Sequence, residues 1–114
     1  MGTAPATTPA TAPTSIEDYQ SAIRDYDSRI TSNNKDAEAY NLRGYEYFKL
    51  ERYSNAISDY NQALWLNPSY AEAYYHRGLA YRAQGYETLA QADFDKAKQL
   101  GYTGASPTSR CTCC

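Results

Sequence analysis

The chain repeats itself at a period of 34 residues, and this repeat restricts the possible folds more than any other feature of the sequence. Residues 37–68 and 71–102 align with 11 identities in 32 positions. A partial copy precedes them, with matching residues 34 positions earlier at Tyr19, Ala22, Ile23, Asp25 and Tyr26. A repeat of this length is typical of a unit that buries its apolar face only against neighbouring copies. The sequence therefore predicts a stack of about two and a half units.

Each copy has the pattern of two helices. Apolar residues recur three and four positions apart, which is the spacing of one face of an α-helix. We expect five helices, near residues 15–32, 36–50, 53–66, 70–84 and 87–100. Ser15 precedes Asp18 by three residues, and Ser69 stands in the same relation to Glu72. Both pairs match the start signal in which a hydroxyl caps a free backbone amide. Gly101 is expected to end the last helix, because glycine adopts the left-handed conformation most easily.

The spacing of aromatic, glycine, alanine and proline residues in the two full copies resembles the tetratricopeptide repeat. These residues are Tyr40, Gly44, Tyr47, Ala56, Tyr60, Ala63 and Pro68 in the first copy, and Tyr74, Gly78, Tyr81, Ala90, Phe94 and Ala97 in the second. The resemblance implies an all-α fold, a right-handed superhelical stack of antiparallel helix pairs known as an α-solenoid. It divides the chain into a half repeat at 15–34 and full repeats at 35–68 and 69–102.

The smallest residues of the pattern have a mechanical role. We expect Gly44 and Gly78 to lie where the second helix of each pair crosses the first, with Ala56 and Ala90 facing them. A close crossing of two helices needs small side chains, so enlarging one of these residues should overpack it at a cost of about 1–3 kcal/mol.

The resemblance also implies a binding surface, because the first helices of tetratricopeptide repeats line a concave groove. The residues expected to point into it are Asn41, Tyr45, Phe48, Lys49, Tyr75, His76, Leu79 and Arg82. Aromatic rings with Lys49, His76 and Arg82 beside them suit an acidic or carboxylate-bearing peptide, since arginine offers a planar pair of donors. We therefore expect a non-catalytic adaptor or scaffold whose partner is a protein or peptide. The alternative for these residues is an ordinary half-exposed surface without a ligand.

The carboxylate clamp of some family members is incomplete in this chain. That clamp uses Lys and Asn on one first helix, Asn on the next, and Lys and Arg on a third. The chain offers Asn41 and Tyr45, then His76, and has no third full unit. We therefore do not expect the clamp that holds chaperone C-termini.

Other functional classes find no support in the sequence. A net charge of −2 without a basic stripe gives no electrostatic reason to expect nucleic acid. His76 is the only histidine, and no phosphate loop or metalloprotease signature is present, so we expect no enzyme, no metal site and no cofactor. No run approaches the roughly 18 apolar residues of a membrane span, and residues 1–14 lack a signal pattern. A soluble, cytoplasmic protein is the default expectation.

The front of the stack suggests a rival function. The half repeat lacks its own first helix, which leaves Tyr19, Ala22 and Tyr26 without their usual cover. Homo-oligomerisation through this face is the alternative to peptide binding. At the other end, Gln91 and Lys98 stand where the middle copy has apolar residues, as expected for the last helix of an array.

The segments outside the repeats differ in composition. Residues 1–14 are rich in Ala, Thr and Pro, and residues 103–114 are small and polar with Cys111, Cys113 and Cys114. Such segments bury too little apolar surface to offset their ordering entropy, so we expect disordered tails. The cysteines leave three interpretations open: a tail without a role, a prenylated membrane anchor like that of Rab-type small GTPases, and a soft-metal site shared between chains.

Overall fold

The computed structural model describes residues 16–102, and all of its regular structure is helical. The five helices are α1 (Ile16–Ser32), α2 (Ala37–Lys49), α3 (Tyr53–Leu66), α4 (Ala71–Ala83) and α5 (Glu87–Gln99). Their bounds agree with the expected ranges to within one residue, so the all-α prediction is confirmed. The predicted tails, and with them Ser15 and the three cysteines, lie outside the described residues.

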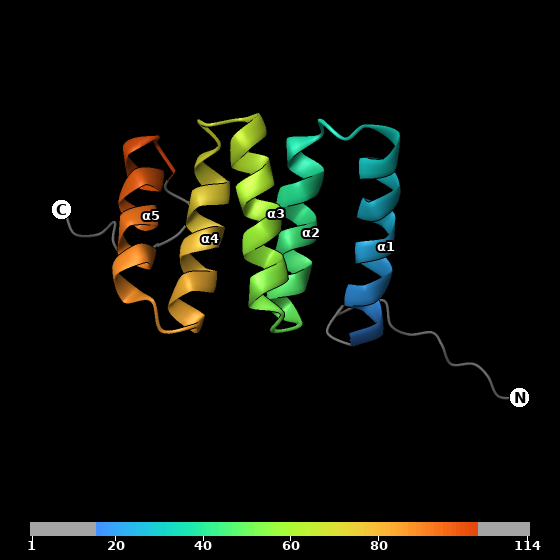
Figure 1. Ribbon diagram of the computed structural model, residues 1–114, viewed down its shortest axis with the longest axis horizontal. Helices are drawn as coiled ribbons and strands as arrows, with labels where there is room; N and C mark the ends of the chain where they lie inside the picture. Colours follow the sequence, from blue (N-terminus) through green and yellow to red (C-terminus); the bar gives the residue numbers. More distant parts are fainter. Residues whose placement is uncertain (1–15, 103–114) are drawn as a thin grey trace, which may run out of the picture.

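The helices stand side by side in chain order, with α1 and α5 at the two ends of the row (Figure 1). Consecutive helices pack against each other all along the row, and α2 also contacts α4. The contact between α2 and α4 places the first helices of the two full pairs next to each other. Surfaces built on these two helices can therefore form one continuous site.

The two helix crossings lie at the predicted glycines. A Cβ atom built on Gly44 would lie 2.7 Å from Cε1 of Tyr60 and 3.1 Å from the carbonyl oxygen of Ala56. A Cβ atom on Gly78 would lie 2.6 Å from Cε1 of Phe94. Real Cβ contacts of this length do not occur, because carbon atoms in contact are about 3.5–4.0 Å apart. The predicted crossing is confirmed, with the aromatic ring as the nearest neighbour.

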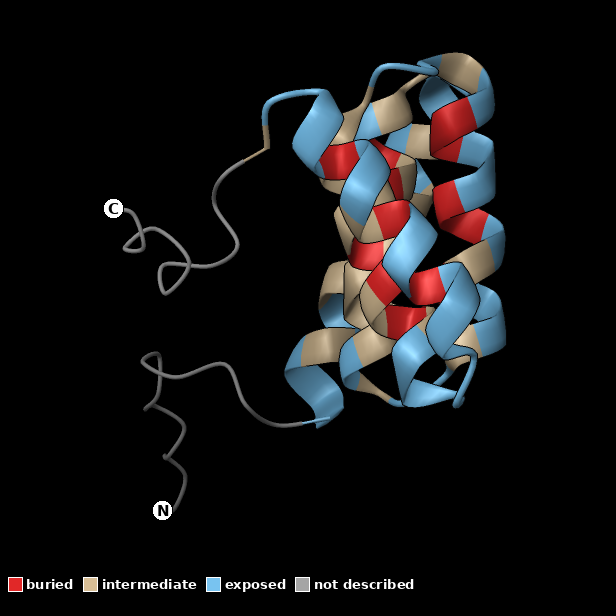
Figure 2. Ribbon diagram, turned by 90° about the vertical axis from the view of Figure 1, so that its left-hand side faces the viewer, coloured by how far each residue is buried: buried red, intermediate tan, exposed pale blue. Residues whose placement is uncertain are grey.

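The core consists of small and aromatic residues between the helices, where Figure 2 shows the buried positions in red. Ala56, Tyr60 and Ala80 are fully buried in one cluster, while Ala63 and Ala73 belong to a second. The hydroxyl of Tyr60 is buried without a hydrogen-bond partner among the described residues. Phe94 occupies the same place one repeat later, so the hydroxyl is not needed for the packing.

An arginine in each full repeat connects three helices, which the sequence analysis did not predict. Arg43 on α2 donates Nε and Nη2 to the carboxylate of Asp59 on α3, at 2.8 and 2.7 Å. Its Nη1 donates to Asp27 on α1 at 2.7 Å. Burial raises the pKa of the Asp59 carboxyl, an effect that the hydrogen bonds from Arg43 oppose. We call this arrangement the arginine bridge.

The second repeat contains the same bridge with one changed acceptor. Arg77 on α4 binds both carboxylate oxygens of Asp93 on α5, at 2.8 and 2.7 Å, and donates Nη1 to Asn61 on α3 at 2.8 Å. Hydrogen bonds from charged donors are the stronger ones in proteins. Both full repeats therefore hold their buried aspartate, Asp59 or Asp93, with a charged donor from the preceding helix.

One predicted helix cap is wrong. The N-cap of α4 is Tyr70, which has no side-chain capping bond, and the backbone amide of Ser69 binds the side chain of Asn67. At the start of α2, Asp36 accepts a hydrogen bond from the amide of Ala39. The predicted cap at Gly101 is confirmed, since this residue adopts a φ of +96°.

Candidate functional site

A row of aromatic rings connects α2, α4 and α5. The ring of Tyr45 stacks on Phe48, with centroids 6.1 Å apart, and on His76, at 4.7 Å. Tyr75 continues the row, because its ring lies 5.4 Å from that of Phe94 and 5.1 Å from that of Tyr102. Tyr45, Phe48 and Tyr75 are half-buried, so their remaining surface is open to a ligand. We call these rings the aromatic row.

Two exposed cations flank the aromatic row. Nζ of Lys49 lies 4.6 Å from the ring centroid of Tyr45, and the guanidinium of Arg82 lies 4.8 Å from that of Phe94. Each cation also has an acidic neighbour. Nζ of Lys49 lies 3.7 Å from Oε1 of Glu46, and Nε of Arg82 lies 3.4 Å from Oε2 of Glu87. The Arg82–Glu87 pair is exposed and contributes at most about 1 kcal/mol, so a ligand carboxylate can replace Glu87, whereas Glu46 is half-buried beside Lys49.

Asn41 and His76 lie beneath this surface and not on it. Nδ1 of His76 is 3.0 Å from Oδ1 of Asn41, and Nδ2 of Asn41 donates to the hydroxyl of Tyr70 at 3.4 Å. Asn41 is 0% exposed and His76 is 9% exposed. Burial lowers the pKa of His76 to about 4, so its ring is neutral at pH 7. The expectation of a surface histidine available to an acidic ligand is therefore wrong.

The remaining predicted residues lie on the two neighbouring first helices. Tyr45, Phe48 and Lys49 come from α2, and Leu79, which is half-buried, comes from α4 with Tyr75 and Arg82. Sequence reasoning missed Tyr102, which follows the last helix and contacts Tyr75. No repeat position signals this contact, because the preceding copy has Pro68 at the equivalent place.

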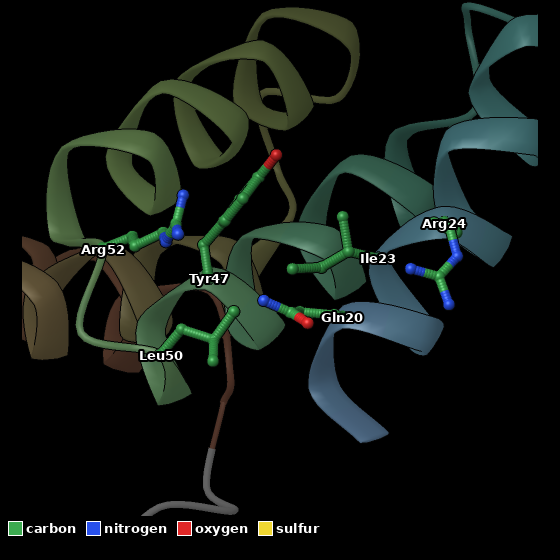
Figure 3. A pocket seen from close by; sticks show the side chains of 6 residues that line it. All are labelled: Gln20, Ile23, Arg24, Tyr47, Leu50 and Arg52. Carbon is green, nitrogen blue, oxygen red and sulfur yellow. The ribbon is translucent and has the colours of Figure 1, made fainter. Parts of the chain in front are cut away.

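A separate pocket of about 380 Å³ lies between α1, α2 and the start of α3. Figure 3 shows Ile23 and Gln20 directed toward Tyr47 and Leu50, with Arg24 and Arg52 on opposite sides. Both arginines are exposed. One repeat later Ser58 and Tyr86 occupy their positions, so the charge of this pocket is not part of the repeat pattern.

Residues 16–102 contain no group of three or more His, Cys, Asp or Glu side chains that could hold a metal ion. Within the same range, no helix is long and apolar enough to cross a membrane.

A row of antiparallel helix pairs, repeating at 34 residues and exposing aromatic rings on adjacent first helices, defines an α-solenoid. Family models for the tetratricopeptide repeat match residues 44–85, 71–100 and 15–64. The chain belongs to the tetratricopeptide repeat family.

Solved structures agree with this assignment. The second tetratricopeptide domain of Spaghetti (RPAP3), bound to the HSP90 peptide SRMEEVD, is 31% identical, with a TM-score of 0.71 over 73% of this chain and 77% of that one. The first such domain of human RPAP3 is 30% identical, with a TM-score of 0.73 over 75% and 67%. MamA is 30% identical with a TM-score of 0.68, and the match covers 75% of this chain but 46% of MamA. None of the curated proteins matches the chain.

Proposed function

We propose that the chain is a non-catalytic interaction module that binds a short acidic segment of a partner protein on the aromatic row. The observation that carries this proposal is the pair of exposed cations, Lys49 and Arg82, on half-buried rings of adjacent first helices. The rings would receive apolar side chains of the peptide, and the cations would receive its carboxylates.

The similar RPAP3 domains support a peptide as the ligand. The second human RPAP3 domain was solved with the HSP70 peptide SGPTIEEVD, which is acidic and ends in a carboxylate like the HSP90 peptide. A clamp on that terminal carboxylate does not suit this chain, because Asn41 is fully buried and bonded to His76. We therefore infer that the acidic side chains of a peptide matter more here than its C-terminus.

Fluorescence anisotropy with labelled SRMEEVD tests this inference, using the free acid and the C-terminal amide. We expect weak binding of the free acid. Replacing the C-terminal carboxylate of the peptide by an amide should lower the affinity by less than about threefold, since this carboxylate has no dedicated site. A variant with Lys49→Ala and Arg82→Ala should lose about tenfold in affinity, because two charged contacts are removed.

The matched control is the double variant Arg24→Ala and Arg52→Ala. It removes the same charge from the pocket between α1 and α3. Equal weakening by the two double variants would show general electrostatic attraction and would contradict a site on the aromatic row. Unchanged binding in the Lys49 and Arg82 variant would contradict it as well.

A capture experiment addresses natural partners. The intact chain and a Tyr45→Ala, Arg82→Ala variant are compared as baits in a native lysate. If both recover the same proteins, the aromatic row is not the binding surface.

A further inference from the structure

The front of α1 carries half of an arginine bridge. Asp25 precedes Asp59 and Asp93 by one and two repeat periods of 34 residues. In the two later copies this aspartate is 5% exposed, because an arginine of the preceding helix covers it. Asp25 is exposed and forms no ion pair or hydrogen bond among residues 16–102.

The rest of that face repeats the surface on which first helices pack. Ala22 and Tyr26 are the equivalents of Ala56 and Tyr60, which are fully buried under α2. On α1 both residues are only half-buried. The face therefore presents the alanine, the aromatic ring and the aspartate that receive a first helix elsewhere in this same chain.

We propose that this face of α1 binds an α-helix of another protein that carries an arginine followed directly by a glycine. The chain shows the geometry twice, in the pairs Arg43–Gly44 and Arg77–Gly78. In each pair the glycine passes the aromatic ring, and the arginine reaches the aspartate with two hydrogen bonds. This interaction goes beyond the proposed peptide binding, because it uses α1 and not the aromatic row.

The described residues offer no unpacked helix of this kind. In residues 16–102 an arginine precedes a glycine only on α2 and α4, which are already packed, and the sequence of residues 1–15 contains no arginine or lysine. A second copy of the chain could supply α2 or α4 only if that helix separated from its own neighbours in the stack. The chemistry of the face therefore favours a helix from a different protein over self-association through Tyr19, Ala22 and Tyr26.

The charges around the face set the geometry of the docked helix. Arg29 stands where Ala63 and Ala97 stand in later copies, and it bonds Asp36 at 3.0 Å and Glu38 at 3.2 Å. Its guanidinium also lies 5.9 Å from the ring centroid of Tyr26. The start of a docked helix must therefore pass farther from α1 than α2 passes from α3, while the arginine and the glycine keep their contacts.

The test uses the full chain and a labelled peptide with the sequence of residues 36–50, which contains the Arg–Gly pair of α2. Isolated peptides of this length are marginally helical, so a second form joins the peptide to the N-terminus through a Gly/Ser linker, which raises its effective concentration to about millimolar. The labelled peptide is followed by fluorescence anisotropy. The tethered form is followed by the gain in melting temperature over a chain that carries the linker alone.

We expect Asp25→Asn to weaken the labelled peptide about tenfold and to remove most of the thermal gain, because it takes away a charge-assisted pair of hydrogen bonds. Replacing arginine by lysine in the peptide should act similarly, since lysine cannot form the planar pair of bonds. Asp95→Asn is the matched control at the other end of the row, and it should change neither readout. Asp25→Asn alone should melt like the parent chain, because Asp25 is exposed.

Several results would overturn the proposal. They are the absence of a thermal gain in the tethered form, an equal gain in the Asp25→Asn and Asp95→Asn chains, and equal binding by the arginine and lysine peptides. Sedimentation that shows a tight dimer dissociated by Tyr26→Glu would also overturn it, since the face would then be occupied by a second copy. No arm of this test changes Lys49 or Arg82 of the chain, so failure here is distinct from failure of the peptide site.

Discussion

The substitutions Gly44→Ala and Gly78→Ala test whether the close helix crossings hold the stack together. Each adds one methyl group at an equivalent position of the two full repeats. The Cβ that Gly44→Ala introduces would lie 2.7 Å from Cε1 and 3.0 Å from Cδ1 of Tyr60. Ordinary carbon contacts are about 3.5–4.0 Å long, so the ring or the helix must move by roughly 1 Å.

The two sites differ in how easily the ring can move. Tyr60 is 0% exposed and its ring lies 5.8 Å from that of His76, so it is surrounded on all sides. Phe94 belongs to the last helix and is half-buried, with the exposed Arg82 beside it. Overpacking costs about 1–3 kcal/mol, while replacing glycine by alanine inside a helix gains about 1 kcal/mol. We expect a net loss of about 2 kcal/mol for Gly44→Ala and about 1 kcal/mol or less for Gly78→Ala.

Urea unfolding followed by circular dichroism measures both free energies, and a loss of about 1 kcal/mol should lower the melting temperature by about 4–8 °C. A double-mutant cycle with Tyr60→Leu identifies the cause, because a smaller side chain relieves the contact. Gly44→Ala should then cost less in the Tyr60→Leu background by about 1 kcal/mol. If Gly44→Ala is neutral, or if it costs less than Gly78→Ala, the reasoning from the crossing is refuted.

Three further predictions concern buried polar groups. Tyr60→Phe should be neutral or stabilising by up to about 1 kcal/mol in urea unfolding, because it removes a hydroxyl without a partner among the described residues and Phe94 already fills the equivalent place. Arg43→Leu should cost about 2–4 kcal/mol by leaving Asp59 buried and unpaired, and adding Asp59→Leu should recover at least half of that loss; a double variant no better than the single one would contradict this account. Burial lowers the folded-state pKa of His76 to about 4 from an unfolded value of about 6.5, so the unfolded chain binds the proton first and stability falls as pH decreases between these values. Wild type should lose about 3 kcal/mol more than His76→Leu between about pH 7 and pH 4, and parallel pH profiles of the two proteins would refute this.

The repeat made the fold predictable, whereas single polar residues were harder to place. Apolar residues at 34-residue spacing determine which helix faces are buried, so the helices and the crossings at Gly44 and Gly78 followed from the pattern. The caps did not, because serine and aspartate are both common N-cap residues, and the sequence does not show that Asp36 caps α2 while Ser69 leaves α4 without a side-chain cap. Aspartate is a common N-cap residue and Asp36 directly precedes α2, so this cap could have been predicted from the sequence.

The candidate surface was predicted only in part for a similar reason. Its position on the first helices follows from the family resemblance, and Tyr45, Phe48 and Arg82 lie on the surface as expected. How deeply each of these side chains is buried depends on neighbours from other helices. His76 is covered by the rings of Tyr45 and Tyr75, and nothing in the repeat pattern reveals this, because the preceding copy has leucine at that position.

The arginine bridges make the two ends of the stack different in chemistry, which the apolar pattern alone does not. Each bridge needs a first helix between two second helices, since Arg43 binds residues 16 positions before and 16 positions after it. A row that begins and ends with second helices has no first helix beyond either end. Within residues 16–102 this leaves two aspartates without an arginine: Asp25, the equivalent of Asp59, and Asp95, the equivalent of Asp27. Asp95 at the rear lies beside the polar Gln91, which donates a hydrogen bond to it at 3.1 Å. Asp25 at the front lies beside Ala22 and Tyr26 instead, so the two ends differ in chemistry, and only the front resembles a surface made to receive a helix.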